Sequence, residues 1–207
     1  MNWQNTLYAL PGILIGLTIH ECCHAFAAWK LGDSTAKDQG RITLNPLKHI
    51  DPIGFLFIVL AGFGWAKPVQ FNPERLRYPR RDKAIIAAAG PLSNLVLGIL
   101  FVQALRFMLA SPWFDMAAHE NLVLIVFFAA AINFGLFIFN LIPIPPLDGS
   151  HIVFSGLNIS WEVQMRFMKI GMPLLFVILI AQRFTDLTIL PIGRLAHNLL
   201  FFFLGGG

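Results

Sequence analysis

Hydrophobic residues in this chain occur in long, nearly unbroken runs that are separated by short polar stretches. A helix that crosses a membrane needs about 20 mostly apolar residues. Four or five segments reach or approach this length: Leu7–Trp29, Ala84–Ala110, Leu122–Ile142, Ile170–Ala181 with its flanks, and Leu187–Leu204. A soluble fold would instead space its apolar residues at the period of a helix or a strand. The pattern therefore indicates several membrane-spanning helices.

Two further apolar pieces, Ile53–Trp65 and Leu147–Leu157, are too short to cross a membrane alone. The first of them carries Gly54, Gly62 and Gly64, which suit a re-entrant turn. Irregular backbone of this kind is tolerated at membrane depth only where protein or water covers it. We therefore expect a loop that enters the membrane and returns to the same side.

Composition supports a membrane protein and excludes other classes. The 207 residues are 57% hydrophobic and only 13% charged, whereas a soluble domain carries about 25% charged residues. The net charge of +4 comes from basic residues in short loops, a pattern of membrane topology that argues against nucleic-acid binding. Cys22 and Cys23 are adjacent, which excludes a disulfide framework. We expect an all-α polytopic membrane protein with about five to six transmembrane helices, in a single domain over residues 1–207.

The basic residues predict how the chain is oriented in the membrane. The stretch Lys67–Lys83 holds six basic and two acidic residues, whereas Ser111–Asn121 has no Lys or Arg. Because cytoplasmic loops are enriched in Lys and Arg, the first stretch is expected in the cytoplasm and the second outside. The N-terminus is then outside, and Leu7–Trp29 runs inward. Basic loops flank Ile53–Trp65 on both sides, so this segment should enter and leave from the cytoplasm.

A metal-binding pattern lies inside the first apolar run. The sequence His20-Glu21-Cys22-Cys23-His24 has the form H-E-x-x-H. Residues four apart on an α-helix point in nearly the same direction, so the two histidines can bind one zinc ion, with Glu21 beside them as general base. An ionisable residue at mid-membrane costs roughly 2.5–3.5 kcal/mol on insertion scales. Three such residues within five positions therefore favour a functional site over a chance match.

A catalytic zinc site usually has three protein ligands and an open position for water. Outside the first run, the acidic residue that lies deep in apolar sequence is Asp148. It follows Pro143, Pro145 and Pro146, which end the helix that begins near Leu122. A broken helix at membrane depth commonly marks a site. We therefore predict that a Pro-broken helix carries Asp148 as the third ligand, in preference to a solvated turn residue.

Taken together, these motifs resemble the site-2 protease family of intramembrane zinc metalloproteases. The resemblance is carried by H-E-x-x-H in the first span and by N-x-x-P-x-P-x-L-D-G at Asn140–Gly149. Shorter matches occur at Asn45–Gly54, Gly64–Pro68 and Gly90–Asn94, so the similarity covers most of the chain. The closest type is a short prokaryotic member without a PDZ or CBS domain.

The resemblance implies that His20, His24 and Asp148 bind one Zn2+ per chain and that Glu21 acts as general base toward a water. The zinc would lower the pKa of this water to about 7 and polarise the scissile carbonyl. The resemblance also implies that Asn140 points into the site, where its amide would steady the oxyanion or the substrate backbone.

The activity implied is that of an intramembrane endopeptidase, which hydrolyses peptide bonds in or near transmembrane segments of membrane-protein substrates. Gly62–Pro68 resembles the family's membrane-embedded loop beside the active site, which would hold an unwound substrate segment by backbone pairing. We expect a multi-pass protein of the cell membrane with its active site near the cytoplasmic side. Its expected partners are the lipid bilayer and membrane proteins, and not nucleic acid.

Two other functions fit parts of the pattern. A metal-ion transporter would use the same ligands as a transit site, but the outer half of the first run offers only Tyr8 and Thr18 along a route outward. A catalytically inactive adaptor that binds membrane helices would tolerate loss of the general base, which is present at Glu21.

The roles of several other polar residues stay open. Cys23 is either an additional metal ligand or a small packing residue, and packing is the better interpretation. His49 and Asp51 either form an auxiliary metal pair or hydrogen-bond the backbone of their own loop. His151 either orients the aspartate three residues before it or faces water.

Overall fold

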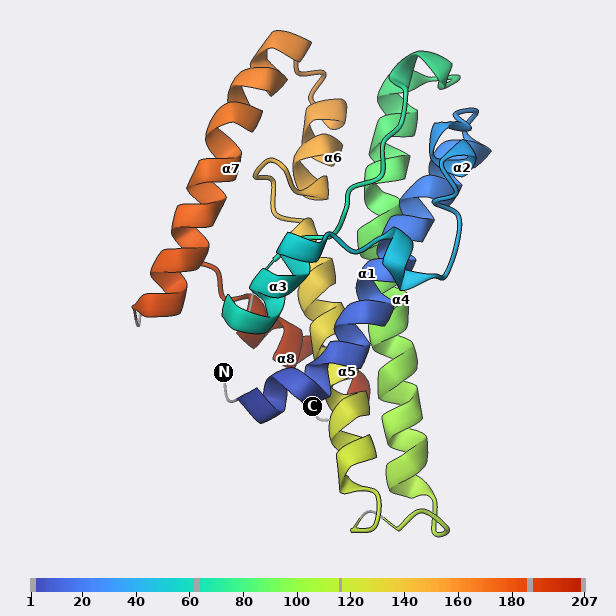
Figure 1. Cartoon of the computed structure of the whole chain (residues 1–207), viewed down its shortest axis with the longest axis vertical. Coiled ribbons are helices and arrows are strands. Elements are labelled where there is room, and N and C mark those ends of the chain that lie inside the picture. Colours follow the sequence, from blue (N-terminus) through green and yellow to red (C-terminus); the bar gives the residue numbers. More distant parts are fainter. Residues whose placement is uncertain (1–2, 62–63, 116, 186–187, 206–207) are drawn as a thin grey trace.

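The computed structural model describes residues 3–61, 64–115, 117–185 and 188–205 (Figure 1). Its helices are α1 (Trp3–Lys30), α2 (Thr35–Asp38), α3 (Pro52–Ala61), α4 (Pro79–Ala110), α5 (Glu120–Asn140), α6 (Asp148–Gly156), α7 (Trp161–Phe184) and α8 (Ile192–Leu204). Two short 3-10 helices, η1 (Pro46–Lys48) and η2 (Pro73–Arg75), lie in the connections. Within the described ranges, β pairing is limited to an isolated bridge between Ile50 and Ala66. The predicted all-α class is confirmed.

The long helices α1, α4 and α5 form the centre of the molecule (Figure 1). One buried cluster joins α4, α5 and α8, and consists of Val102, Ala130, Phe134, Ala196 and Leu200. A second cluster joins α1, α3 and α5, with Ala9, Ile13 and Ile58 at its centre and Leu17, Phe128 and Ile132 packed around it. Lipid tails are as apolar as these side chains, so close packing rather than the hydrophobic effect holds such helices together.

Four helices are able to cross a membrane by their length and composition: Gln4–Lys30, Pro79–Ala110, Glu120–Asn140 and Trp161–Gln182. The polytopic class is therefore confirmed, although the described part of the chain has four such helices where five to six were expected. The run Leu187–Leu204 contributes only α8, which begins after Pro191 and has 13 residues. That length spans about 20 Å, less than the hydrocarbon core of about 30 Å. Leu187 itself lies outside the described residues.

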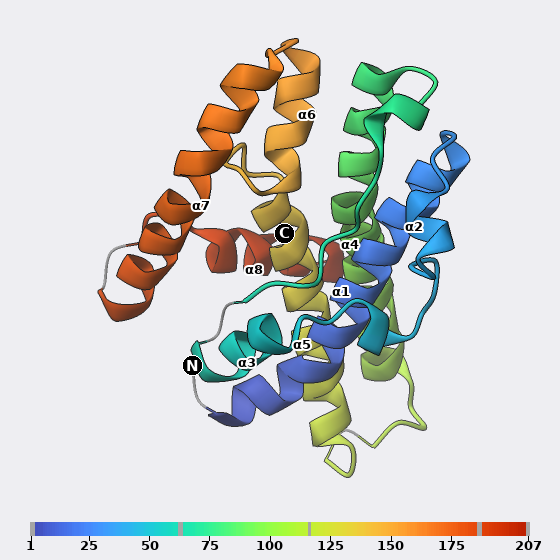
Figure 2. The ribbon, with the colours of Figure 1, turned by 45° about the horizontal axis from the view of Figure 1, so that its top comes forward.

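α6 and α7 lie side by side at one edge of the molecule in both views (Figure 1, Figure 2). The ring of Phe154 on α6 contacts the ring of Phe167 on α7, with centroids 6.0 Å apart. Only 11% of the membrane-spanning part of α7 is buried. A helix that exposes apolar side chains on most of its surface requires an apolar surrounding. α7 is thus built to face lipid.

The segment around α3 has the shape of a re-entrant loop. α3 leads away from His49, and the chain then returns to it, because Lys67 N–H donates to His49 O at 2.8 Å. The bridge between Ile50 and Ala66 joins the two arms at the same place. Gly62, one of the three glycines expected in the turn, lies outside the described residues. The side of the membrane from which the loop enters stays a prediction.

The predicted break between two helices is also present. α5 ends at Asn140 and α6 begins at Asp148, with the proline-rich turn between them. The start of α6 lies directly on the end of α5 because residue 149 is glycine: a Cβ there would fall 2.2 Å from Leu141 O. This close approach holds Asp148 beside the end of α5, facing α1.

We predict that the two ends of α4 lie on opposite sides of the membrane. Arg77 lies just before the start of α4 and Glu120 begins α5, beyond the other end of α4, and both are exposed. In a variant without Cys22 and Cys23, Arg77→Cys and Glu120→Cys should react with a membrane-impermeant maleimide from opposite faces, Arg77→Cys from the cytoplasm. Labelling of both from one face would contradict the topology.

Candidate metal centre

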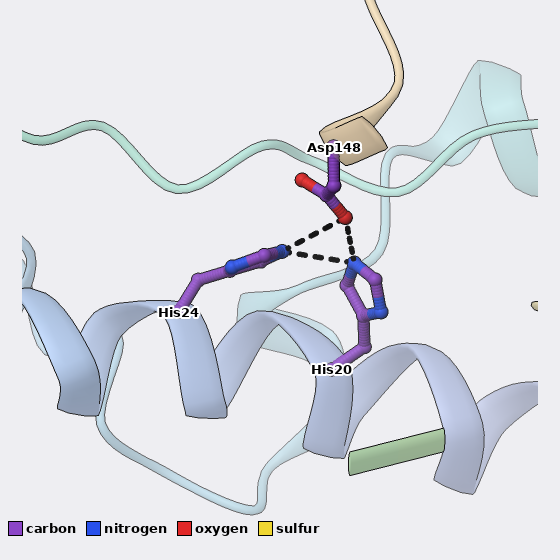
Figure 3. A group of neighbouring side chains, drawn as sticks. All are labelled: His20, His24 and Asp148. Carbon is purple, nitrogen blue, oxygen red and sulfur yellow. Dashed lines mark hydrogen bonds and ion pairs between the residues drawn. The ribbon is translucent and has the colours of Figure 1, made fainter. Parts of the chain in front are cut away.

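The two histidines of the H-E-x-x-H pattern lie one turn apart on α1 and are buried, with 5% and 8% of their surface exposed. Their Nε2 atoms are 2.9 Å apart. Figure 3 shows both rings turned toward the same point above the helix. The predicted spacing thus produces the predicted convergence.

Asp148 reaches the same point from α6. Its Oδ2 lies 3.2 Å from Nε2 of His20 and 3.4 Å from Nε2 of His24 (Figure 3). In the described part of the chain, these three side chains bring their ligand atoms close enough together to hold a metal ion. Two segments far apart in the sequence are therefore brought together as expected.

The hydrogen bonds of the imidazoles fix which nitrogen faces the centre. His24 Nδ1 lies 2.7 Å from Ile86 O, and a carbonyl can only accept, so Nδ1 carries the proton. His20 Nδ1 donates to Asn94 Oδ1 at 2.7 Å. The Asn94 amide is itself oriented, because its Nδ2 donates to Gly16 O at 3.1 Å. When the rings are neutral, as metal ligation requires, the lone pair on each Nε2 therefore points to the common centre.

This donor set fits a divalent cation. Two imidazole lone pairs and a carboxylate oxygen face one another, and Asp148 Oδ2 is buried without a hydrogen-bond partner. Ligands in a tetrahedral zinc site, bound at 2.0–2.1 Å, are about 3.3 Å from each other. The observed separations of 2.9–3.4 Å bracket this value. The residues that would hold zinc are therefore His20, His24 and Asp148.

α4 closes the site on one side and supports it. A Cβ at Gly90 would lie 2.4 Å from His24 Nε2 and 2.6 Å from His20 Nε2, so only glycine fits. One turn further, Asn94 Nδ2 also donates to Asn133 Oδ1 of α5 at 3.0 Å, and both asparagines are fully buried. Outer hydrogen bonds of this kind orient metal-binding imidazoles and raise their basicity.

Sequence reasoning assigned no role to Asn94, Asn133 or Gly90. The available signal was the polarity of the two asparagines within apolar runs, since a polar residue inside a membrane is costly and often functional. Their partners, however, lie on other helices, and a linear pattern does not reveal them.

Glu21 lies next to the ligands but outside their group. The residue is 8% exposed, and its carboxylate accepts a hydrogen bond from Val69 N–H at 3.0 Å and lies 3.7 Å from Arg41 Nη2. Neither Val69 nor Arg41 was singled out from the sequence. Asn140 is the last residue of α5, and its Nδ2 donates to Leu136 O at 3.0 Å, so its role toward a substrate stays a prediction.

The remaining polar residues have local roles. Asp51 Oδ1 accepts a hydrogen bond from Gly54 N–H at the start of α3, and His49 Nε2 donates to Thr43 O. These bonds support the interpretation that the two side chains hold the backbone of their own loop. Cys22 and Cys23 are free and half-buried.

Comparison with known proteins identifies the family. Residues 106–182 match the model of Peptidase family M50. A Bacillus subtilis protein named "Putative zinc metalloprotease YwhC" is 44% identical over 148 residues, which cover 70% of this chain and 67% of that protein. The chain belongs to peptidase family M50. Membership confirms the predicted site-2 protease family and, at the level of the family, the predicted metalloprotease.

Mycobacterial relatives match over a smaller share of their length. Two proteins named "Putative zinc metalloprotease Rip2" are each 33% identical: that of Mycolicibacterium smegmatis over 69% of this chain and that of Mycobacterium tuberculosis over 68%. The chain spans about half of each, 54% and 53%. No solved structure matches the chain.

We predict that the purified protein contains one zinc per chain and that His20→Ala or Asp148→Ala lowers this content sharply, because two ligands hold zinc poorly. Elemental analysis measures it. His197→Ala, an exposed histidine on α8, is the matched control and should change nothing. Full occupancy in Asp148→Ala would remove Asp148 from the ligand set. If the wild type contains no zinc, the short distance between the two Nε2 atoms would instead reflect a proton shared by the imidazoles.

Asn94→Ala should weaken zinc binding about 10- to 100-fold, because His20 loses the acceptor that orients its ring. Competition with a chelator of known affinity measures the change. Ser93→Ala is the control, since this neighbouring hydroxyl donates to Gly90 O, away from the His20 ring nitrogen. Equal affinity of Asn94→Ala and Ser93→Ala would assign Asn94 to helix packing alone.

Proposed function

We propose that this protein is an intramembrane zinc metalloendopeptidase, which hydrolyses peptide bonds in or near transmembrane segments of membrane-protein substrates. The observation that carries the proposal is the convergence of His20, His24 and Asp148 within helices of a membrane bundle, with Glu21 adjacent to them. The names of the matched relatives describe zinc metalloproteases, which agrees with this donor set.

His20, His24 and Asp148 would hold the metal, and when bound, zinc supplies Lewis-acid polarisation of the scissile carbonyl and a lowered pKa for water. Glu21 would accept a proton from the attacking water and deliver it to the leaving amine. The carboxylate is buried, lies near a guanidinium and stands outside the ligand group. The Asn140 amide would donate to the oxyanion or to the substrate backbone.

The surroundings of the site fit a substrate that is itself a membrane helix. The ligands project from α1, which is long enough to span, and from a broken helix beside it. A helical substrate hides its carbonyls in hydrogen bonds, so it would unwind locally before attack. The extended segment after α3 passes Glu21 at Val69, and it would offer backbone groups for pairing with such an unwound stretch.

The proposed location is the cell membrane, with the site near the cytoplasmic side. The support is the distribution of charge: the basic stretch Lys67–Lys83 and the ligand-bearing part of α1 lie toward the same end of the bundle (Figure 1). Water would reach the site from that end. Membrane-protein substrates and the bilayer are the proposed partners.

Glu21→Gln should retain zinc and fold but abolish cleavage of a helical substrate, because an amide of nearly the same shape cannot accept the proton. Cleavage by purified protein in detergent or vesicles, together with zinc content, measures both. Glu120→Gln, an exposed carboxylate at the other end of the bundle, is the control. Near wild-type cleavage by Glu21→Gln would contradict the proposed mechanism. A wild type that does not cleave would favour the alternative function, a catalytically inactive adaptor that binds membrane helices.

A further inference from the structure

Arg41 is a buried cation beside the metal centre. Only 4% of its surface is exposed, whereas arginine is almost never fully buried unless it is paired. It follows the turn after α2, which is closed by Arg41 N–H donating to Ala36 O at 2.9 Å. The turn directs the side chain inward, toward the extended segment 66–72.

The guanidinium holds this segment by its backbone. Arg41 Nη2 donates to Lys67 O at 2.6 Å, and Nη1 donates to Pro68 O at 3.1 Å. Its Nε is buried without a hydrogen-bond partner, so the two terminal nitrogens carry the hydrogen bonds. Because the guanidinium is planar and donates to two carbonyls, its positive charge is held in one position.

The same guanidinium faces Glu21. Arg41 Nη2 lies 3.7 Å from Glu21 Oε2, and the next residue of the segment, Val69, donates its N–H to this oxygen at 3.0 Å. One carboxylate oxygen is thus held by a cation and by a backbone amide that the cation itself keeps in place. Removing one member of a buried ion pair leaves the other charge uncompensated.

The segment has anchors that do not depend on Arg41. At one end, Lys67 N–H donates to His49 O at 2.8 Å. At the other, Asn72 N–H donates to Asp33 Oδ2 at 2.6 Å. Burial raises the pKa of Asp33, but hydrogen bonds from Thr35 and Asn72 outweigh it and hold that pKa below its ordinary value. Loss of Arg41 should therefore leave the two ends of the segment in place but loosen its middle at Pro68 and Val69, and with it the hold on Glu21.

A carboxylate released at this position could bind the metal instead. Glu21 follows the ligand His20 directly and precedes the ligand His24 by three residues, so it lies on the adjoining face of α1. Carboxylate oxygens are good zinc ligands, and a catalytic site needs one position that no protein group fills. A base that bound the metal would fill that position.

We propose that Arg41 is a positioning residue that holds the Glu21 carboxylate on the extended segment and keeps it out of the ligand group of His20, His24 and Asp148. The inference rests on the proposed function for the meaning of Glu21, but its central prediction concerns metal coordination. It can therefore be tested without any substrate.

The test uses the full chain loaded with Co2+, whose visible absorption reports the number and type of ligands. In Arg41→Ala the cobalt spectrum should change, and release of the metal to a chelator should slow by on the order of 10-fold or more, as Glu21 becomes a ligand. In Glu21→Gln/Arg41→Ala both effects should vanish, because the amide is a poor ligand. Lys48→Ala, an exposed cation on the same loop, should resemble wild type.

Unchanged spectrum and release in Arg41→Ala would overturn the proposal, and so would changes that persist in the double variant. If Arg41→Ala does not fold, Arg41→Gln keeps a donor for one carbonyl, removes the charge and should give the same cobalt signature. Cleavage gives a second readout: kcat should fall on the order of 100-fold in Arg41→Ala, with KM nearly unchanged. A wild type that binds metal but does not cleave would count against the proposed function, and the cobalt results would still decide the role of Arg41.

Discussion

The organisation of this bundle depends on a single constraint: polar groups inside lipid-facing helices must find their partners within the protein, because lipid offers none. His20 meets this requirement through Asn94, Asn94 through Gly16 and Asn133, and Asn133 through Ala129 O at 2.8 Å. The chain of hydrogen bonds runs through α1, α4 and α5. The helices are consequently held in a register that a purely apolar interface would not specify, and the orientation of one imidazole depends on that register.

The same constraint accounts for the way in which the chain departs from regular helix. Backbone is irregular at two places close to the site, the re-entrant segment and the turn between α5 and α6. In the first, carbonyls freed from a helix are taken up by Arg41 and by the bridge to Ile50. In the second, the prolines have no backbone N–H, so fewer donors need a hydrogen-bond partner. Each irregular segment delivers one component of the site: Val69 contacts Glu21, and Asp148 joins the two histidines.

Much of the fold and the ligand set follows from sequence because the relevant signals are local. Run lengths predicted the long helices, a four-residue spacing predicted the facing of His20 and His24, and clustered prolines predicted the break before Asp148. The last helix was predicted to be too long, because a run of hydrophobic residues does not reveal that α8 starts only after Pro191. Arg41 was not recognised because in the sequence it is one more basic loop residue. Its structural role arises from hydrogen bonds to carbonyls 26 and 27 residues away.

The length of α4 has a consequence for how hydrolysis and a membrane coexist. With 32 residues the helix measures about 48 Å, well beyond a hydrocarbon thickness of about 30 Å, so part of it stands in the headgroup layer or the helix tilts strongly. The end that carries Arg80 and Arg81 is the one suited to headgroups. Ile86 and Gly90, which touch the imidazoles, lie only about 10 and 16 Å along the axis from that end. The ligand group therefore lies only a few water diameters along the helix axis from the end suited to headgroups.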